Sequence, residues 1–290
     1  MQPLPTEPSW ERKALNRCSF GCRDVDELHV KKVGWDAWVE EQLNPPVGDD
    51  SQLADHLNQQ TLYIHYEAST DLNSNEDSKG WDAVEENRKL NFLSYSEENL
   101  YDLLINAGDT HPWDEVWRAY EEEMSSVYIR AAHSKYQLRE VLTDFWLNHF
   151  SICSDGDDIL RLSILTFDRD VIRPRVFGNF RDMLGAVARS TAMQWYLDNA
   201  RSSAALPNEN YARELMELHT LGKKAYLGTT KKAAIEHNAD GIAVGFNDHD
   251  VIEVARAFSG WTVEHGQWGG DRVGNLPFTW LFTYNPSQHN

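Results

Sequence analysis

The sequence predicts an all-α protein, a single mostly helical domain over residues 1–290 that resembles a multi-helix bundle with long loops. Apolar residues recur at helical spacing in many short segments, and capping residues or Gly and Pro breaks separate these segments. No segment alternates apolar and polar residues as a half-buried strand does, although a small β-hairpin is expected near 239–247 or 261–284. Short helices joined by short loops favour helix-on-helix packing.

The composition excludes several classes of protein. The formal net charge of −19 argues against a nucleic-acid partner and against an anionic membrane surface, because both require basic clusters. A membrane span requires a run of about eighteen apolar residues, and the sequence contains none. Cys18, Cys22 and Cys153 are too few for a disulfide framework. The chain as written has no signal peptide and is expected in the cytoplasm, whereas a processed chain would be periplasmic or secreted.

The N-terminal third divides into a helical part and a polar part. Residues 11–43 predict two or three short helices, in which Trp35, Trp38 and Val39 follow helical spacing. Residues 44–90 are polar, with acidic and Ser/Asn-rich stretches, and are predicted to form a surface excursion.

Two longer helices are predicted next. The helix over 114–132 is expected to bury one apolar face, which consists of Val116, Tyr120, Met124, Val127 and Ala131. Ser134 and Gln137 have the spacing of a capping box that begins the following helix. The apolar stripe of that second helix consists of Leu138, Val141, Leu142, Phe145, Trp146 and His149.

The remaining elements are shorter. Helices are predicted from Thr166 to Ile172, from Asn179 onward and over 191–199. Residues 223–247 are rich in Gly, Asn and Lys and are expected to be a loop insertion, after which Asp248 caps another helix.

The segment 208–222 is predicted to be a helix at the centre of the bundle. Asn208 is a good N-cap, Glu209 lies in the first turn, and Gly222 is the expected C-terminal stop. At 100° per residue one arc contains the apolar residues Tyr211, Ala212, Leu215, Met216, Leu218 and Leu221. Glu214 and His219 fall within this arc, and a buried acid or imidazole must be paired, protonated or used.

Several motifs together resemble one bacterial family, the "domain of unknown function 1800". They are FWLNHF at 145–150, RDVIRPRVFGNFRDML at 169–184, AMQWYLDN at 192–199, NENYARELMELHTLG at 208–222 and DVIEVARAFSGWTV at 250–263. The opening segments LNRCSFG and WDAWVEEQLNP are also similar to this family. The resemblance covers nearly the whole chain and implies a mostly helical bacterial protein, with no established reaction. Because residues 282–290 resemble the middle of the family domain, it also implies that the C-terminal part of the domain is missing.

The candidate site gathers polar residues on or beside helix faces that are expected to be buried. Its predicted catalytic residues are His149, Asp198, Glu214 and His219, and its predicted supporting residues are Asn199, Glu209, Arg213 and Glu217. Carboxylates and imidazoles can perform general acid–base hydrolysis or bind a divalent metal ion, for which the candidate ligands are His149, Glu214 and His219. In an α-helix Glu214 and His219 point about 140° apart, so a shared site needs groups from another helix.

Two functional interpretations remain open. The first is a hydrolase or metal-assisted hydrolase, and the eleven tryptophans slightly favour a small-molecule or glycan-type substrate for it. The alternative is a non-catalytic, envelope-associated scaffold or binding protein whose polar cluster is a buried hydrogen-bond and ion-pair network. The sequence does not determine the oligomeric state.

Overall fold

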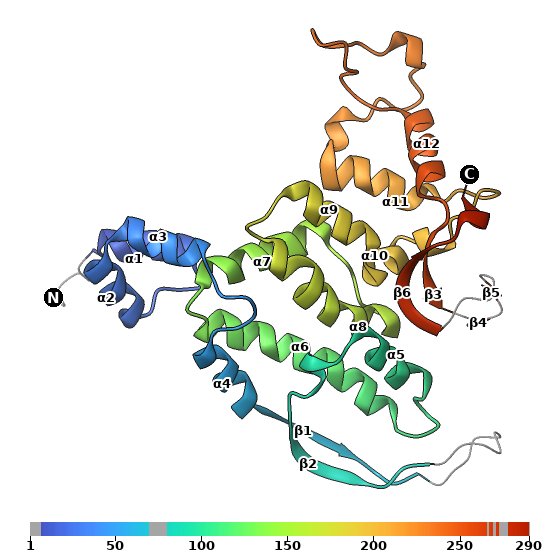
Figure 1. Cartoon of the computed structure of the whole chain (residues 1–290). Coiled ribbons are helices and arrows are strands. Elements are labelled where there is room, and N and C mark those ends of the chain that lie inside the picture. The colour runs from blue at the N-terminus through green and yellow to red at the C-terminus, as the bar shows by residue number, and fades with distance from the viewer. Residues whose placement is uncertain (1–6, 70–79, 266, 269–270, 273–277, 290) are drawn as a thin grey trace, which may run out of the picture.

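A computed structural model describes residues 7–69, 80–265, 267–268, 271–272 and 278–289, and it confirms a mostly helical fold with small β-elements (Figure 1). The α-helices of these residues are α1 Trp10–Cys18, α2 Asp24–Val33, α3 Trp35–Leu43, α4 Ser51–Gln59, α5 Glu97–Ile105, α6 Trp113–His133, α7 Gln137–Phe150, α8 Asp158–Thr166, α9 Phe180–Arg189, α10 Thr191–Tyr196, α11 Glu209–Glu214 and α12 Asp248–Phe258. The strands are β1 Thr61–Tyr66, β2 Val84–Lys89, β3 Trp261–His265, β4 Gln267–Trp268, β5 Asp271–Arg272 and β6 Phe278–Tyr284. None of the helices in these ranges combines the length and the apolar character needed to cross a membrane.

The first three helices form a small lobe beside the N-terminal end of α7 (Figure 1). Its core consists of Leu15, Val30 and Trp38, and Cys18 and Cys22 pack against it as free thiols. The two or three helices predicted over 11–43 are therefore three.

The segment 44–90 contains regular structure that the sequence does not predict. It includes α4 and an antiparallel ribbon in which β1 pairs with β2, from Thr61 opposite Lys89 to Tyr66 opposite Val84. Only Ile64 of these strands is buried, so the ribbon lacks the alternating pattern that identifies a strand. Arg118 of α6 fixes the ribbon by donating hydrogen bonds to three of its backbone carbonyls, at 2.7–3.1 Å.

The centre of the molecule is built on α6, which packs against α8 and α5. Its apolar core is closed by Trp280 of β6, which is fully buried and stacks on Tyr101 with ring centroids 4.8 Å apart. β6 pairs antiparallel with β3, which confirms the hairpin expected at 261–284. At 239–247, the other location proposed for a hairpin, the structure has no named strand, and Ala243 makes one isolated bridge to His237.

The segment 208–222 begins and ends where the sequence predicts. Asn208 caps α11 by accepting a hydrogen bond from Asn210 N–H at 2.9 Å, and Gly222 has a φ of +89°. After Glu214, however, the helix continues as a π-helical turn over Leu215–Thr220. The expected apolar arc is wrong at Leu218 and Leu221, each 58 % exposed, because a π-turn has more residues per turn than the α-helix assumed.

Candidate functional site

The inward face of α6 carries charged side chains. Glu115, Arg118, Glu122 and Glu123 are all buried and follow helical spacing. Of the five apolar residues predicted for this face only Val116 is buried, and the other four are half-buried. The predicted helix is confirmed, but its apolar face is only partly buried. Hydropathy assigns ionisable residues to solvent and cannot recognise partners that neutralise them.

Helix α7 likewise buries charged residues and exposes an apolar residue of its predicted face. Arg139 and Glu140 are buried, whereas Phe145 of the predicted apolar stripe is 54 % exposed. The helix begins at Gln137, so Ser134 is not its N-cap. The Ser134 hydroxyl instead donates a hydrogen bond to Glu140 Oε1 at 3.0 Å, which helps to hold this carboxylate inside the protein.

A second π-helical turn, Phe167–Ile172, contains Asp168, and Arg173 follows it directly. Asp168 is 3 % exposed and accepts hydrogen bonds from Arg173 Nε and Nη2 at 3.1 and 3.0 Å. Such two-pronged pairs are among the strongest charge-assisted contacts. Pro174, which has no N–H, follows directly, and the backbone becomes a short 3₁₀ turn.

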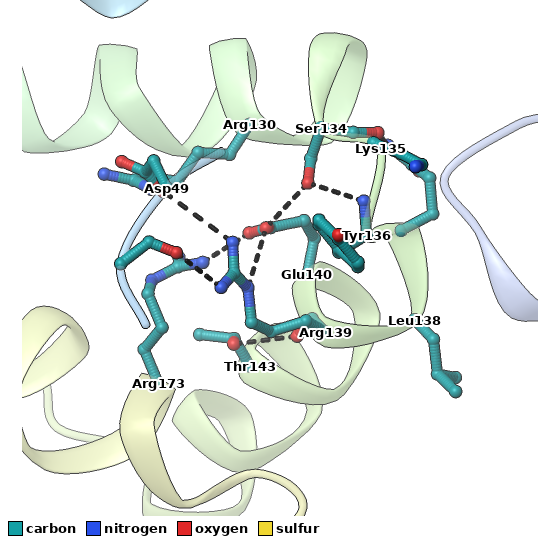
Figure 2. A network of polar contacts seen from close by, with 12 residues as sticks. Asp49, Arg130, Ser134, Lys135, Tyr136, Leu138, Arg139, Glu140, Thr143 and Arg173 are labelled. Carbon is teal, nitrogen blue, oxygen red and sulfur yellow. Dashed lines mark hydrogen bonds and ion pairs between the residues drawn. The ribbon is translucent and has the colours of Figure 1, made fainter. Parts of the chain in front are cut away.

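The charged groups form one continuous network across four segments of the chain (Figure 2). Asp49, in the loop between α3 and α4, forms an ion pair with Arg130 of α6 and lies 3.8 Å from Arg139 Nη2. Glu140 lies between two guanidinium groups, with Oε1 3.5 Å from Arg139 Nε and Oε2 2.5 Å from Arg173 Nη1. The alternating signs give each buried charge a partner of opposite sign, which offsets part of the desolvation cost of burying it.

Glu123 and Asp168 form the deepest part of the network. Burial raises the pKa of Glu123 well above its usual range, and the adjacent charge of Asp168 and a hydrogen bond to it raise that pKa further. Burial would also raise the pKa of Asp168, but the charge and hydrogen bonds of Arg173 and the hydrogen bond from Glu123 lower it. The pKa values of the two carboxyl groups therefore move in opposite directions, upward for Glu123 and downward for Asp168.

The network forms one side of a cavity of about 860 Å³. Its cationic lining residues are Lys89, Arg130, Arg139, Arg169 and Arg173, and its apolar ones include Pro45, Pro46, Val47, Leu57, Leu90, Leu93, Pro174, Val176 and Phe177. The loop 44–50, the end of β2 and the segment after the π-turn therefore meet α6 and α7 around a space with charged and apolar walls.

The four arginines of the cavity differ in how fully their donors are used. Arg173 bonds to Asp168 and Glu140, and Arg169 bonds to Asp170 and to the carbonyls of Leu93 and Tyr95. Their guanidinium groups are therefore committed within the protein.

Arg139 and Arg130 retain unused donors. The Arg139 side chain is 4 % exposed, and its Nη1 donates to the carbonyls of Pro46 and Gly48 at 3.2 and 2.7 Å. Its Nε and Nη2 are buried and make no hydrogen bond within the described residues. Arg130 forms an ion pair with Asp49, and its charge also acts on the carboxyl groups of Glu123 and Asp168. Buried N–H groups that make no hydrogen bond are rare in folded proteins. The Arg139 end of the cavity is therefore a candidate binding site.

Of the residues predicted from the sequence, the structure brings His149 and His219 together. Their ring centroids are 6.2 Å apart, and His149 Nε2 donates to the His219 carbonyl at 3.4 Å. His219 is 5 % exposed, and its buried Nδ1 has no hydrogen-bond partner in the described residues. Burial, with a smaller contribution from the charge of His149, lowers the pKa of His219 to about 4, so this imidazole is neutral at physiological pH.

The other predicted residues lie in different surroundings. Asp198 is exposed and lies 3.6 Å from Arg201, while Asn199 is buried and donates to Gln194 at 3.0 Å. The described residues show no ion pair or hydrogen bond for the half-buried Glu214 carboxylate. Arg213 pairs with two predicted supporting residues, Glu209 at 3.3 Å and Glu217 at 3.5 Å.

The predicted metal ligands are not arranged as a group of three. Within the described ranges, no group of three or more His, Cys, Asp or Glu side chains is placed to hold a metal ion. His149, Glu214 and His219 therefore form no three-residue metal site there.

Sequence reasoning missed the cavity and its arginines. A signal exists in the charged residues of α6, because Glu115, Arg118, Glu122 and Ser126 recur every three or four positions. Such a polar stripe, interpreted as a buried face, would have indicated that α6 buries charged groups, and its last member, Ser126, donates a hydrogen bond to Glu123 of the network at 3.3 Å. The contribution of Asp49 is a tertiary contact between segments 81 residues apart, which no local pattern encodes.

The whole chain can be compared with known proteins. A family model described as a protein of unknown function, DUF1800, matches residues 13–290. No curated protein and no solved structure matches the chain. Because the family model covers nearly all 290 residues, the chain belongs to the DUF1800 family.

Proposed function

We propose that this protein binds a small anionic ligand in the arginine-lined cavity. The observation that carries the proposal is the buried guanidinium group of Arg139, a residue of the cavity lining. Its Nε and Nη2 make no hydrogen bond in the described residues, and the carboxylates of Glu140 and Asp49 lie 3.5 and 3.8 Å from them. A carboxylate or phosphate oxygen is the acceptor that such a group fits best. A binding protein is the alternative to a hydrolase that the sequence leaves open. The proposed ligand site, however, lies at other residues than those predicted from the sequence.

The charge distribution of the chain supports an anionic ligand. Although the formal net charge is −19, five lysine and arginine side chains line this one cavity. A cationic cavity in an otherwise acidic molecule selects the sign of charge that can bind there. The volume of about 860 Å³ is also within the range of small-molecule sites.

Calorimetric titration with inorganic phosphate and with acetate, at low and high NaCl, tests the proposal. We expect the wild type to bind at least one of these anions, more weakly at high salt. Arg130→Gln is expected to weaken binding about tenfold, the value of one charge-assisted hydrogen bond. Arg256→Gln is the matched control, because Arg256 is exposed and pairs with Glu253 on the surface of α12. A wild-type protein that binds neither these anions nor any larger carboxylate or phosphate compound, or an equal loss in the control, would contradict the proposal.

A hydrolase that uses His149 and His219 is the second candidate function. Its specific support is the neutral, buried His219 imidazole, whose Nδ1 is free to accept a proton or bind a ligand. Exposed Phe145 and Phe180 lie beside His149, with ring centroids 6.3 and 6.4 Å from it, and such faces stack on sugar rings. This favours a glycan-type substrate for a hydrolase at this position.

Metal analysis and a hydrolysis screen over ester and glycan substrates test the second candidate. The informative variants are His219→Ala and Glu214→Gln, each measured for turnover and for thermal stability. Loss of turnover with retained stability supports a hydrolase, whereas loss of stability alone, with no turnover in the wild type, rejects it.

A further inference from the structure

The lining of the cavity indicates the shape and polarity of its ligand as well as the sign of the ligand's charge. The loop 44–50 supplies one protein carboxylate, Asp49, to the arginines that have spare donors. It also supplies an apolar surface beside that carboxylate, which consists of Pro45, Pro46 and Val47.

Asp49 is held at Arg130 and Arg139 by the local backbone. Gly48, directly before it, has a φ of +77°, a conformation that glycine adopts without strain. Asp50, directly after it, caps α4 by accepting hydrogen bonds from Gln52 and Leu53 N–H at 3.1 Å each. The Asp49 side chain is therefore fixed between a turn and a helix start, and its reach toward the arginines is limited.

This limited reach explains why Arg139 retains unused donors. The Asp49 oxygen lies 3.8 Å from Arg139 Nη2, which is longer than a hydrogen bond. A carboxylate or phosphate that is not tethered to the chain could approach both guanidinium groups at hydrogen-bonding distance. The Asp49 carboxylate thus occupies the place beside Arg130 and Arg139 where a free carboxylate or phosphate group would bind.

The apolar walls indicate what is attached to that headgroup. The apolar lining residues include Leu57 and residues 45–47 from one region of the sequence, and Leu93, Val176 and Phe177 from two others. Val47 is fully exposed in this structure, so a ligand that covered it would remove an apolar side chain from water. An inorganic anion alone would leave Val47 in contact with solvent.

We infer that the ligand is an amphipathic oxyanion, with an apolar body and a carboxylate or phosphate headgroup, and that its headgroup displaces Asp49 from Arg130 and Arg139. The inference rests on the proposed function and adds the ligand class and the group that competes with it. In the structure described here, Asp49 acts as an internal competitor for the headgroup site.

The ligand class is tested on the wild-type protein alone. The probes are octanoate, octyl phosphate, acetate, inorganic phosphate and octan-1-ol, compared by calorimetric titration. We expect octanoate or octyl phosphate to bind at least about tenfold more tightly than acetate or phosphate, because each buried CH₂ adds about 0.8 kcal/mol, a factor of about four. Octan-1-ol is expected to bind more weakly than both octyl anions, and the tighter of the two identifies the headgroup as carboxylate or phosphate.

The competition by Asp49 is tested with Asp49→Asn, which keeps the shape of the side chain and removes its charge. We expect this variant to bind the octyl anions about tenfold more tightly than the wild type, the value of one displaced charged contact. Asp49→Glu, which retains the carboxylate, should bind like the wild type. Asp55→Asn is the matched control, because Asp55 is exposed on α4, and it should have no effect.

The outcomes separate the two proposals. If acetate or phosphate binds, but the octyl chain adds no affinity or Asp49→Asn binds no more tightly, the inference is overturned and the proposed function stands. If no anion, short or long, binds to the wild type or to Asp49→Asn, both are overturned.

Discussion

Arg173 donates Nε and Nη2 to the two carboxylate oxygens of Asp168, at 3.1 and 3.0 Å, in the interior of the protein. The same guanidinium donates Nη1 to Glu140 at 2.5 Å, so one side chain neutralises two buried acids from different elements. This arrangement links α7 to the π-helical turn Phe167–Ile172.

Replacing Arg173 is expected to destabilise the fold. Arg173→Gln would leave the Glu140 and Asp168 carboxylates without their shared cation, and breaking a buried ion pair in this way costs about 3–5 kcal/mol. Urea unfolding at neutral pH measures this loss. Arg181→Gln, at an exposed position on α9, should change the free energy of unfolding by less than about 0.5 kcal/mol. Equal stability of the two variants would mean that the network contributes nothing to the fold.

Glu123 predicts a pH dependence of stability with a defined sign. Its pKa is raised in the folded protein, so its contribution is present below the usual Glu value of 4.5 and decreases as pH rises toward the folded-state pKa. Glu123→Gln, which cannot ionise, should therefore gain stability relative to the wild type as pH increases from about 5 to about 8.

Urea unfolding at several pH values compares Glu123→Gln with Glu121→Gln, a change at an exposed position on the same helix. The stability difference between Glu121→Gln and the wild type should stay nearly constant with pH. A difference for Glu123→Gln that also stays constant would show that Glu123 is not protonated in the folded protein.

His219 predicts the opposite sign at lower pH. Its pKa falls from 6.5 to about 4 on folding, because burial and the charge of His149 disfavour the imidazolium. The stability that this neutral group contributes is present above pH 6.5 and is lost progressively as pH falls toward about 4. His219→Gln should therefore show a weaker decrease of thermal stability over this window than the wild type. The control is His237→Gln, at an exposed position, which should follow the wild-type profile.

The orientation of α7 can be tested with two phenylalanines of one helix. Phe150 is 2 % exposed, and Phe150→Ala should cost about 3–5 kcal/mol. Phe145 is 54 % exposed, and Phe145→Ala should cost less than about 1 kcal/mol. Denaturant unfolding measures the loss of unfolding free energy in both variants. A larger loss for Phe145→Ala than for Phe150→Ala would mean that the predicted apolar stripe does face the core.

The sequence predicts the parts of the fold that local chemistry determines. Asn208 and Gly222 mark the ends of their helix because a cap and a positive φ are properties of single residues. The hairpin of β3 and β6 lies in one of the two regions expected. The helical fold class follows from periodicity, which many short segments share.

The candidate site is only partly accessible to such reasoning. Arg139 and Glu140 are buried because residues from distant segments neutralise them, and hydropathy assigns both to solvent. The faces of the π-turns are misassigned because the assumed period of 3.6 residues does not apply there. His149 and His219, predicted as one group, do lie together, whereas the arginine-lined cavity emerges only in three dimensions.

The most direct test of the central claim is a crystal of the wild-type protein soaked with 4-bromobenzoate, an amphipathic carboxylate with an anomalous scatterer. We expect an anomalous bromine peak between the apolar walls of the cavity, with the carboxylate bound to Arg130 and Arg139 and Asp49 displaced. A cavity without bromine density, with Asp49 still paired to Arg130 in crystals that bind the compound elsewhere or not at all, would contradict it.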